Sequence, residues 1–310
     1  MRTRSKGLPP VFPTELEKEI FTLCAISEPS EIPSLMRVAW RVKSWTEPIM
    51  WRTVIVDPRP RDPDSEYPVF TWDVLMSVVR NESTRPSSFL HDVVRELSLN
   101  VHDHSTQDIA TVLSLCTGVQ NLSLIIKESQ VDKVPPLAAL IRSLPLKHLY
   151  LDVRPRFCVL DESGAFASLT HLELRNHSFS SSPHQIGSWA SSLSRLPSLT
   201  HLSFNSHAFL PMCIMVLQTC ATLRVLVMLR GYVNEWSFQS ERWVALARDG
   251  RFVRICCARN LLDWERGARG GDDYWQRAER FIERRRERKV PALQIDDFED
   301  PTWPPARDVE

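Results

Sequence analysis

Three histidines recur in the same short phrase, and their chemistry is the first candidate for a function. His148, His171 and His201 stand in "LKHLYL", "LTHLEL" and "LTHLSF". Imidazoles brought together could bind a metal ion, respond to pH or contact a protein. No cysteine accompanies these histidines, so we expect a protein contact and neither a metal nor another cofactor. A solvated strand face without a dedicated ligand remains the plain alternative.

A catalytic centre finds less support in the residues. The sequence "HDH" at His102 to His104 could suggest acid–base or metal chemistry, but one loop with alternating His and Asp is more often only solvated. There is no phosphate-binding glycine loop, no G-x-S-x-G elbow and no H-E-x-x-H motif. The chain has only nine glycines. We therefore expect that the protein is not an enzyme.

The histidine phrases belong to a recurring pattern, in which an apolar residue is followed by others three and five places later. Its copies begin 23 to 30 residues apart, at Val94, Val119, Leu146, Leu169, Leu199, Leu223 and Phe252, after a weaker copy at Trp51. Each copy predicts a short strand with one apolar face. Stretches with helical apolar spacing lie between the copies, as at Ile109 to Cys116. The predicted unit is a strand followed by a helix.

From Val94 to Ala258 this pattern resembles a leucine-rich repeat, and "LTHLEL" at Leu169 is its best copy. The resemblance implies an α/β fold, an irregular leucine-rich-repeat solenoid with parallel short strands and outer helices. A generic parallel α/β domain without true repeats is the alternative. If the repeats are the recognition part, the residues between the leucines form the open strand face, where we expect an unidentified protein substrate to bind. The candidate partner-binding residues are His148, Tyr150, Asp152, His171, Glu173, Arg175, His201 and Ser203.

The first fifty residues differ from the repeats and predict three short helices. "FPTELEKEIF" at Phe12 begins with Pro13, has Thr14 as a possible N-cap with Glu17 three places later, and places apolar residues on one stripe. A second helix is expected near Pro33 and a third around Trp45. Three short helices bury little by themselves, so they require either the solenoid or a partner.

This segment, from Leu8 to Val56, resembles the F-box-like element of fungal repeat proteins. The residues that carry the likeness, and that become candidate adaptor-binding residues, are Pro13, Leu16, Ile20, Phe21, Leu35, Val38 and Trp45. The resemblance implies docking to a Skp-type adaptor and, through it, to a cullin complex. The chain would then be the noncatalytic substrate receptor of an SCF-type ubiquitin ligase. The alternatives are an N-terminal cap of the solenoid and a stand-alone repeat scaffold without a ligase link.

Composition sets the remaining expectations. The chain has 38 basic and 38 acidic residues, so net charge favours neither nucleic acid nor an anionic membrane. Without a predicted signal peptide or membrane span, we expect a cytoplasmic or nuclear protein with reduced cysteines. The predicted divisions are a flexible N-terminus (1–10), the F-box-like helices (11–50), the solenoid (51–260), a helix that caps the last repeat (261–290) and a mobile tail (291–310).

Overall fold

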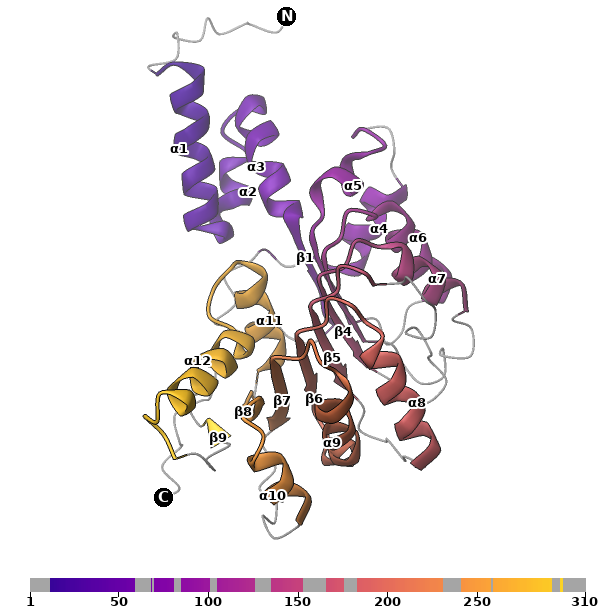
Figure 1. The fold of residues 1–310 in the computed structure, drawn as a ribbon. Helices are drawn as coiled ribbons and strands as arrows, with labels where there is room; N and C mark the ends of the chain where they lie inside the picture. Colours follow the sequence, from indigo (N-terminus) through magenta and orange to yellow (C-terminus); the bar gives the residue numbers. More distant parts are fainter. Residues whose placement is uncertain are drawn as a thin grey trace, which may run out of the picture.

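The computed structural model describes residues 12–58, 68, 70–80, 85–100, 105–125, 135–152, 166–175, 183–230, 241–257, 259–291 and 296–297. A single parallel sheet runs through the molecule, and its strands lie in the order in which they occur in the chain, from β1 to β9 (Figure 1). Both "HDH" and most of the proline-rich stretch after Asp57 lie outside the described residues.

The strands are short, and in β1 to β7 the core-facing apolar residues recur at every second position. Their bounds are β1 Thr53–Val56, β2 Glu96–Asn100, β3 Asn121–Ile125, β4 His148–Asp152, β5 His171–Arg175, β6 His201–Phe204, β7 Val225–Arg230 and β8 Phe252–Cys256. Neighbouring strands pair so that the leucines of the repeated pattern lie opposite each other, as Leu149 does with Leu172. The α/β class and the parallel strands are confirmed.

Helices cover one face of this sheet. Their bounds are α4 Trp72–Arg80, α5 Phe89–Val93, α6 Thr106–Leu115, α7 Pro135–Ser143, α8 Pro183–Ser194, α9 Leu210–Thr219 and α10 Glu241–Ala247. The leucines of the strands and the apolar sides of these helices form one large buried cluster, which we call the main core. Figure 1 shows α4, α6, α7, α8 and α9 along this side of the sheet.

The register of the last long strand differs from the predicted one. The repeated pattern placed Arg254 on the open face, with Ile255 and Cys257 in the core. In the structure Phe252 pairs with Leu226 and Arg254 with Met228, so Arg254 lies on the main-core side and is almost fully buried. A shift of one residue moves every side chain of a strand to the other face. Both Val253 and Ile255 consequently face away from the main core.

The N-terminal helices are α1 Thr14–Ser27, the short 3-10 turn η1 Pro29–Glu31, α2 Ile32–Leu35 and α3 Trp40–Arg52. Thr14 is the first helical residue of α1 and not its N-cap, a place that Pro13 takes without a side-chain hydrogen bond. The last turn of α3 leads directly into β1. Trp51 is buried there, with its ring 4.8 Å from that of Phe70 and 6.2 Å from that of Phe89. This aromatic contact joins the N-terminal helices to the sheet.

The C-terminal segment does not cap the end of the sheet as the sequence suggested. It forms α11 Asn260–Ala268 and α12 Tyr274–Arg286, which lie on the face opposite to α4–α10 (Figure 1). A two-residue strand, β9 Asp296–Asp297, then pairs with β8, within the stretch expected to be a mobile tail. The sheet therefore has helices on both faces.

Candidate functional site

The predicted partner-binding face is covered by the chain's own C-terminal helices. Tyr150, Glu173, His201 and Ser203 are all buried, with 6% of the surface of Tyr150 exposed and none of that of Glu173. The remaining candidates that can be described, His148, His171 and Arg175, are half-buried. The side chain of Asp152 lies outside the described residues. The expectation that these side chains form an open surface is wrong, because α11 and α12 lie on them.

The three histidines form the ladder that their positions predicted. The ring centroids of His148 and His171 are 4.1 Å apart, and those of His171 and His201 are 4.0 Å apart with the planes nearly parallel. The indole of Trp275, on α12, approaches His171 and His201 edge-on, at 5.3 and 5.7 Å. Burial lowers the pKa of His148 to about 4 and that of His171 to about 2, so both rings are neutral at pH 7.

Their polar atoms are engaged separately and do not converge on one point. The Nδ1 atoms of His171 and His201 each lie 2.8 Å from the hydroxyl of the preceding threonine. The Nε2 atom of His201 lies 3.1 Å from a carboxylate oxygen of Glu279 on α12. Across the described part of the chain, no group of three or more His, Cys, Asp or Glu side chains is placed to hold a metal ion.

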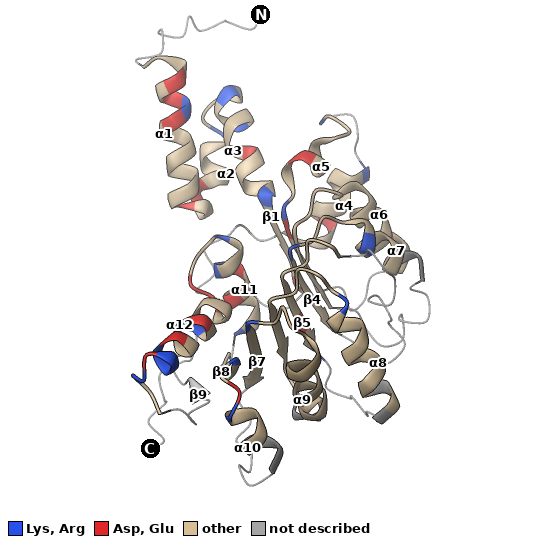
Figure 2. Ribbon diagram, in the orientation of Figure 1, with Lys and Arg blue, Asp and Glu red and all other residues tan. Residues whose placement is uncertain are grey.

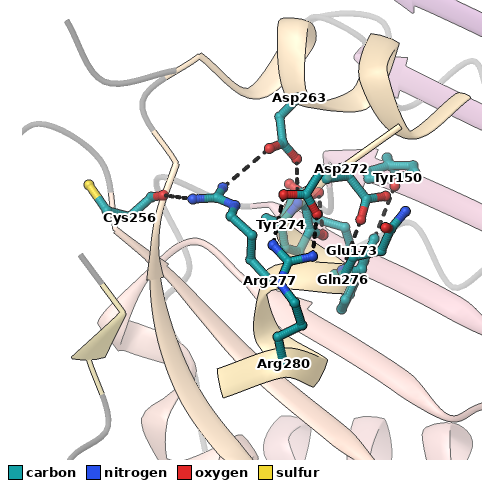
Figure 3. Close-up of polar contacts among 11 residues, drawn as sticks. Tyr150, Glu173, Cys256, Asp263, Asp272, Tyr274, Gln276, Arg277 and Arg280 are labelled. Atoms are coloured by element: carbon teal, nitrogen blue, oxygen red, sulfur yellow. Dashed lines mark hydrogen bonds and ion pairs between the residues drawn. The ribbon is translucent and has the colours of Figure 1, made fainter. Parts of the chain in front are cut away.

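Tyr274 connects α12 to the centre of the sheet (Figure 3). Its hydroxyl donates to a carboxylate oxygen of Glu173 at 2.9 Å and lies 2.9 Å from the hydroxyl of Ser203. Arg175 forms an ion pair with the same Glu173 carboxylate. Burial and the nearby Glu173 raise the pKa of Tyr274 well above its usual value, which keeps its hydroxyl protonated. The carboxylate thus has a fixed donor from α12 and a fixed cation from its own strand.

Further polar contacts hold the two C-terminal helices to each other (Figure 3). Asp263 on α11 accepts from the backbone N–H of Tyr274 at 3.0 Å and from the guanidinium of Arg277 at 3.2 Å. Arg277 also donates to the backbone carbonyl of Cys256. On the outer side, Arg280 forms a bidentate pair with Asp272. Each of these charged side chains is therefore held by partners within the chain.

The N-terminal helices present the opposite arrangement, an apolar surface that no other described part of the chain covers. Nine large apolar side chains are exposed in the described residues, and seven of them lie between Phe12 and Trp40. On α1, the exposed fractions of Leu16, Ile20 and Leu23 are 49%, 44% and 57%. Their spacing of four and three residues puts them on one side of the helix, with Phe12 and Ile26 at its margins. We call these five residues the α1 stripe.

The opposite side of α1 holds the helix in place. Ala25 is fully buried, and α1 packs against α3. Arg41, on α3, donates to both carboxylate oxygens of Glu17 at 2.7 and 2.8 Å, which lowers the pKa of Glu17 and raises that of Arg41. The stripe therefore points outward because the other side of the helix is already engaged.

A second exposed apolar group lies between α2 and α3. Val38 is 61% exposed and Trp40 is 79% exposed, with the ammonium of Lys43 5.0 Å from the centre of the Trp40 ring. Of the candidate adaptor-binding residues, Pro13, Leu16, Ile20 and Val38 are exposed, whereas Phe21, Leu35 and Trp45 are half-buried. The structure thus separates those candidates into outward-facing residues and residues that contribute to packing.

Comparison with known proteins adds no assignment. No family model matches this chain, and no curated protein does either. The function must therefore be argued from the residues and their positions.

Several surface residues were missed in the sequence. Phe12, Leu23, Ile26 and Trp40 are exposed but were not among the candidates. The spacing of Leu16, Leu23 and Ile26 was the available signal, since it continues the stripe by two further turns. The covered sheet face also had a signal. In the copy that begins at Leu223, the strand residues that alternate with the core-facing ones are themselves apolar: Val225, Val227 and Leu229. An apolar open face requires a cover.

Proposed function

We propose that the N-terminal helices bind a Skp-type adaptor, and that the chain is a noncatalytic substrate-recognition subunit of an SCF-type ubiquitin ligase. In this proposal the sheet and its outer helices are a leucine-rich-repeat-like solenoid. The observation that carries the proposal is the exposure of the α1 stripe together with Val38 and Trp40, because large exposed apolar side chains gathered on a folded helical unit are typical of a protein-binding site.

The stripe fits a protein partner better than a membrane. Helices that lie on anionic membranes carry Lys and Arg beside their apolar face. α1 instead has Glu15, Glu17 and Glu19 with a single Lys18, and Figure 2 shows the acidic residues along it. None of the described helices is both long and apolar enough to cross a membrane.

The exposure of the stripe also favours an adaptor-binding element over a cap of the sheet. If α1 were a cap, its apolar residues would pack on the first strand near Trp51. Trp51 instead packs against Phe70 and Phe89, and Leu16 and Ile20 remain exposed. This arrangement supports the adaptor-binding hypothesis over the cap.

Co-purification of the full chain with a Skp-type adaptor tests the proposal. We expect the unmodified chain to retain the adaptor in a stoichiometric complex, and the Leu16→Asp/Ile20→Asp variant to lose it while its circular dichroism spectrum stays unchanged. Lys18→Asp is the matched control, because it adds the same charge to α1 on the side away from the stripe. We expect this control to retain the adaptor.

Two results would contradict the proposal. The first is a well-folded chain that retains no adaptor, which would leave the stand-alone interaction scaffold. The second is a Leu16→Asp/Ile20→Asp variant that melts the whole protein, which would make α1 part of the structural core.

A further inference from the structure

The C-terminal segment is attached to the sheet in a different way from the other helices. Between β1 and β8 the described connecting helices lie on the main-core face. Each strand pairs with the one before it, always on the same side, so the strand order of the sheet follows the chain. The connection from β8 to β9 continues in that direction, but α11 and α12 lie on the other face. It therefore has the opposite hand. Connections of one hand, the right-handed one, make up about 98% of parallel crossovers.

This difference indicates that α11 and α12 are not a further repeat of the sheet but a cover laid on one of its faces. The packing agrees. Six side chains of α11 and α12 form a second apolar cluster with the open-face strand residues, and none of the helices α4–α10 contributes to it. The six are Trp264, Tyr274, Trp275, Ala278, Phe281 and Ile282. No side chain of α11 or α12 belongs to the main core.

The cover contacts the sheet in the manner of a bound ligand. The indole N–H of Trp264 donates to the side-chain oxygen of Asn121 at 3.0 Å, and that of Trp275 donates to the hydroxyl of Tyr150 at 3.0 Å. The contacts of Tyr274 with Glu173 and Ser203 follow the same scheme. Each is an aromatic side chain that buries its ring and satisfies one polar group of the strand face. Such aromatic anchors commonly dominate the binding energy of protein interfaces.

We infer that the face of β4–β8 is a helix-binding site, which α12 occupies in cis, and that a target protein binds there with a helix of the same pattern. The pattern is Asp273 as N-cap, then Tyr274 and Trp275, a small residue at Ala278, and Phe281 with Ile282. This inference rests on the proposed function for its biological role as target recognition. The helix-binding property itself does not depend on the adaptor.

Competition in cis predicts how such a site behaves. A tethered helix competes at an effective concentration of about millimolar when its linker is short. The linker between α11 and α12 is short and contains Gly270, which has φ +74°. The unmodified chain should therefore bind a separate helix weakly, and weakening the cis helix should strengthen that binding.

Hydrogen exchange of the unmodified full chain is the first test. We expect the backbone amides of α11 and α12 to exchange together, about tenfold or more faster than those of β5 and β6, because the cover opens while the sheet stays folded. Equal exchange rates in the helices and the strands would overturn the inference. They would show that the cover opens only with the whole domain.

A peptide with the sequence of residues 272–291, labelled with a fluorophore, is the second test. We expect it to bind the Trp275→Ala chain about tenfold or more tightly than the unmodified chain, by fluorescence anisotropy. The matched control Glu283→Gln, on the exposed side of α12, should give no gain. The same peptide with its own Trp275 replaced by Ala should lose binding. Failure of the intact peptide to bind the Trp275→Ala chain would overturn the inference, and adaptor co-purification reports on the proposed function separately.

Discussion

The two helical segments at the ends of the chain differ in where their apolar residues point. Both are amphipathic, but α1–α3 lie beyond the end of the sheet, where α3 leads into β1, and α11 and α12 lie on one face of it (Figure 1). The N-terminal segment leaves Leu16, Leu23 and Trp40 exposed, whereas the C-terminal segment buries Trp264, Trp275 and its other large apolar residues on the strands. Amphipathic spacing alone therefore does not separate a docking surface from a structural cover. The neighbouring surface decides between them.

Replacement of a tryptophan in each segment should give the largest contrast. Trp275 is 2% exposed, and Trp275→Ala removes the ring contacts with His171 and His201 as well as the hydrogen bond to Tyr150. We expect it to weaken the folded state by about 3–5 kcal/mol. Trp40→Ala, at an exposed ring, should change it by less than about 1 kcal/mol. Urea titration followed by circular dichroism measures both, and equal losses would refute the contrast.

Ion pairs at the two ends provide the next contrast. Glu173 is fully buried, with Arg175 and the Tyr274 hydroxyl as partners. Glu173→Gln leaves the half-buried Arg175 without a counter-charge, and we expect a loss of about 3 kcal/mol. Glu17→Gln, in the exposed pair with Arg41, should produce a change too small for the same urea titration to resolve. Tyr274→Phe separates the tyrosine hydrogen bond from the ion pair, and should cost about 1–2 kcal/mol.

Much of the fold could be predicted from the sequence. The repeated apolar spacing predicted the strands from β1 to β7 and their register, including the pairing of His148, His171 and His201. Each strand could be predicted because its pattern is local: the alternation of apolar residues fixes which side faces the core. The same reasoning failed at Phe252, because the pairing with β7 places Arg254 on the core side and Val253 and Ile255 on the other, against the apolar pattern.

The cover over the strand face could not be predicted in the same way. Which surface α12 contacts depends on residues more than 100 positions earlier, such as Tyr150, and no local pattern encodes that contact. The sequence correctly predicted that the three histidines lie in one column, but the prediction that they are exposed was wrong. The exposure of the α1 stripe was likewise not readable from its spacing, because an identical stripe on another helix could be buried.

The histidine ladder should make the C-terminal end, but not the N-terminal end, sensitive to acid. The pKa of His148 is about 4 in the folded chain and about 6.5 when unfolded, so protons bind the unfolded chain more readily between these values. Stability from these rings is full above pH 6.5 and falls as the pH decreases towards 4. We expect the unmodified chain to lose about 1–2 kcal/mol over this range relative to His148→Phe, which keeps an aromatic ring without a titrating group.

Other groups around the ladder titrate in the same range and must be separated from it. Lys147 lies near His148, Arg224 near His201, and Glu279 contacts His201 from α12. Burial raises the pKa of Glu96 to about 7 and that of Asp273 to about 6. These acids oppose the histidines, since their contribution to stability grows as the pH falls through those values. The unmodified chain and the variant share these other groups, so the difference between their unfolding temperatures at each pH isolates the contribution of the replaced histidine. Parallel pH profiles would contradict the prediction.

Polar replacement within the α1 stripe should have the smallest effect on stability. Leu23 and Ile26 are 57% and 60% exposed, and glutamine is a good helix former. Leu23→Gln/Ile26→Gln should therefore change the free energy of unfolding by less than about 0.5 kcal/mol, because each replaced side chain already lies largely in water. Phe281→Gln, at a buried position of α12, is the matched replacement and should cause a loss of at least about 3 kcal/mol. Urea titration of the two variants decides the comparison: if the stripe residues were as costly to replace as Phe281, the N-terminal helices would be held by an intramolecular contact and would not be open to a partner.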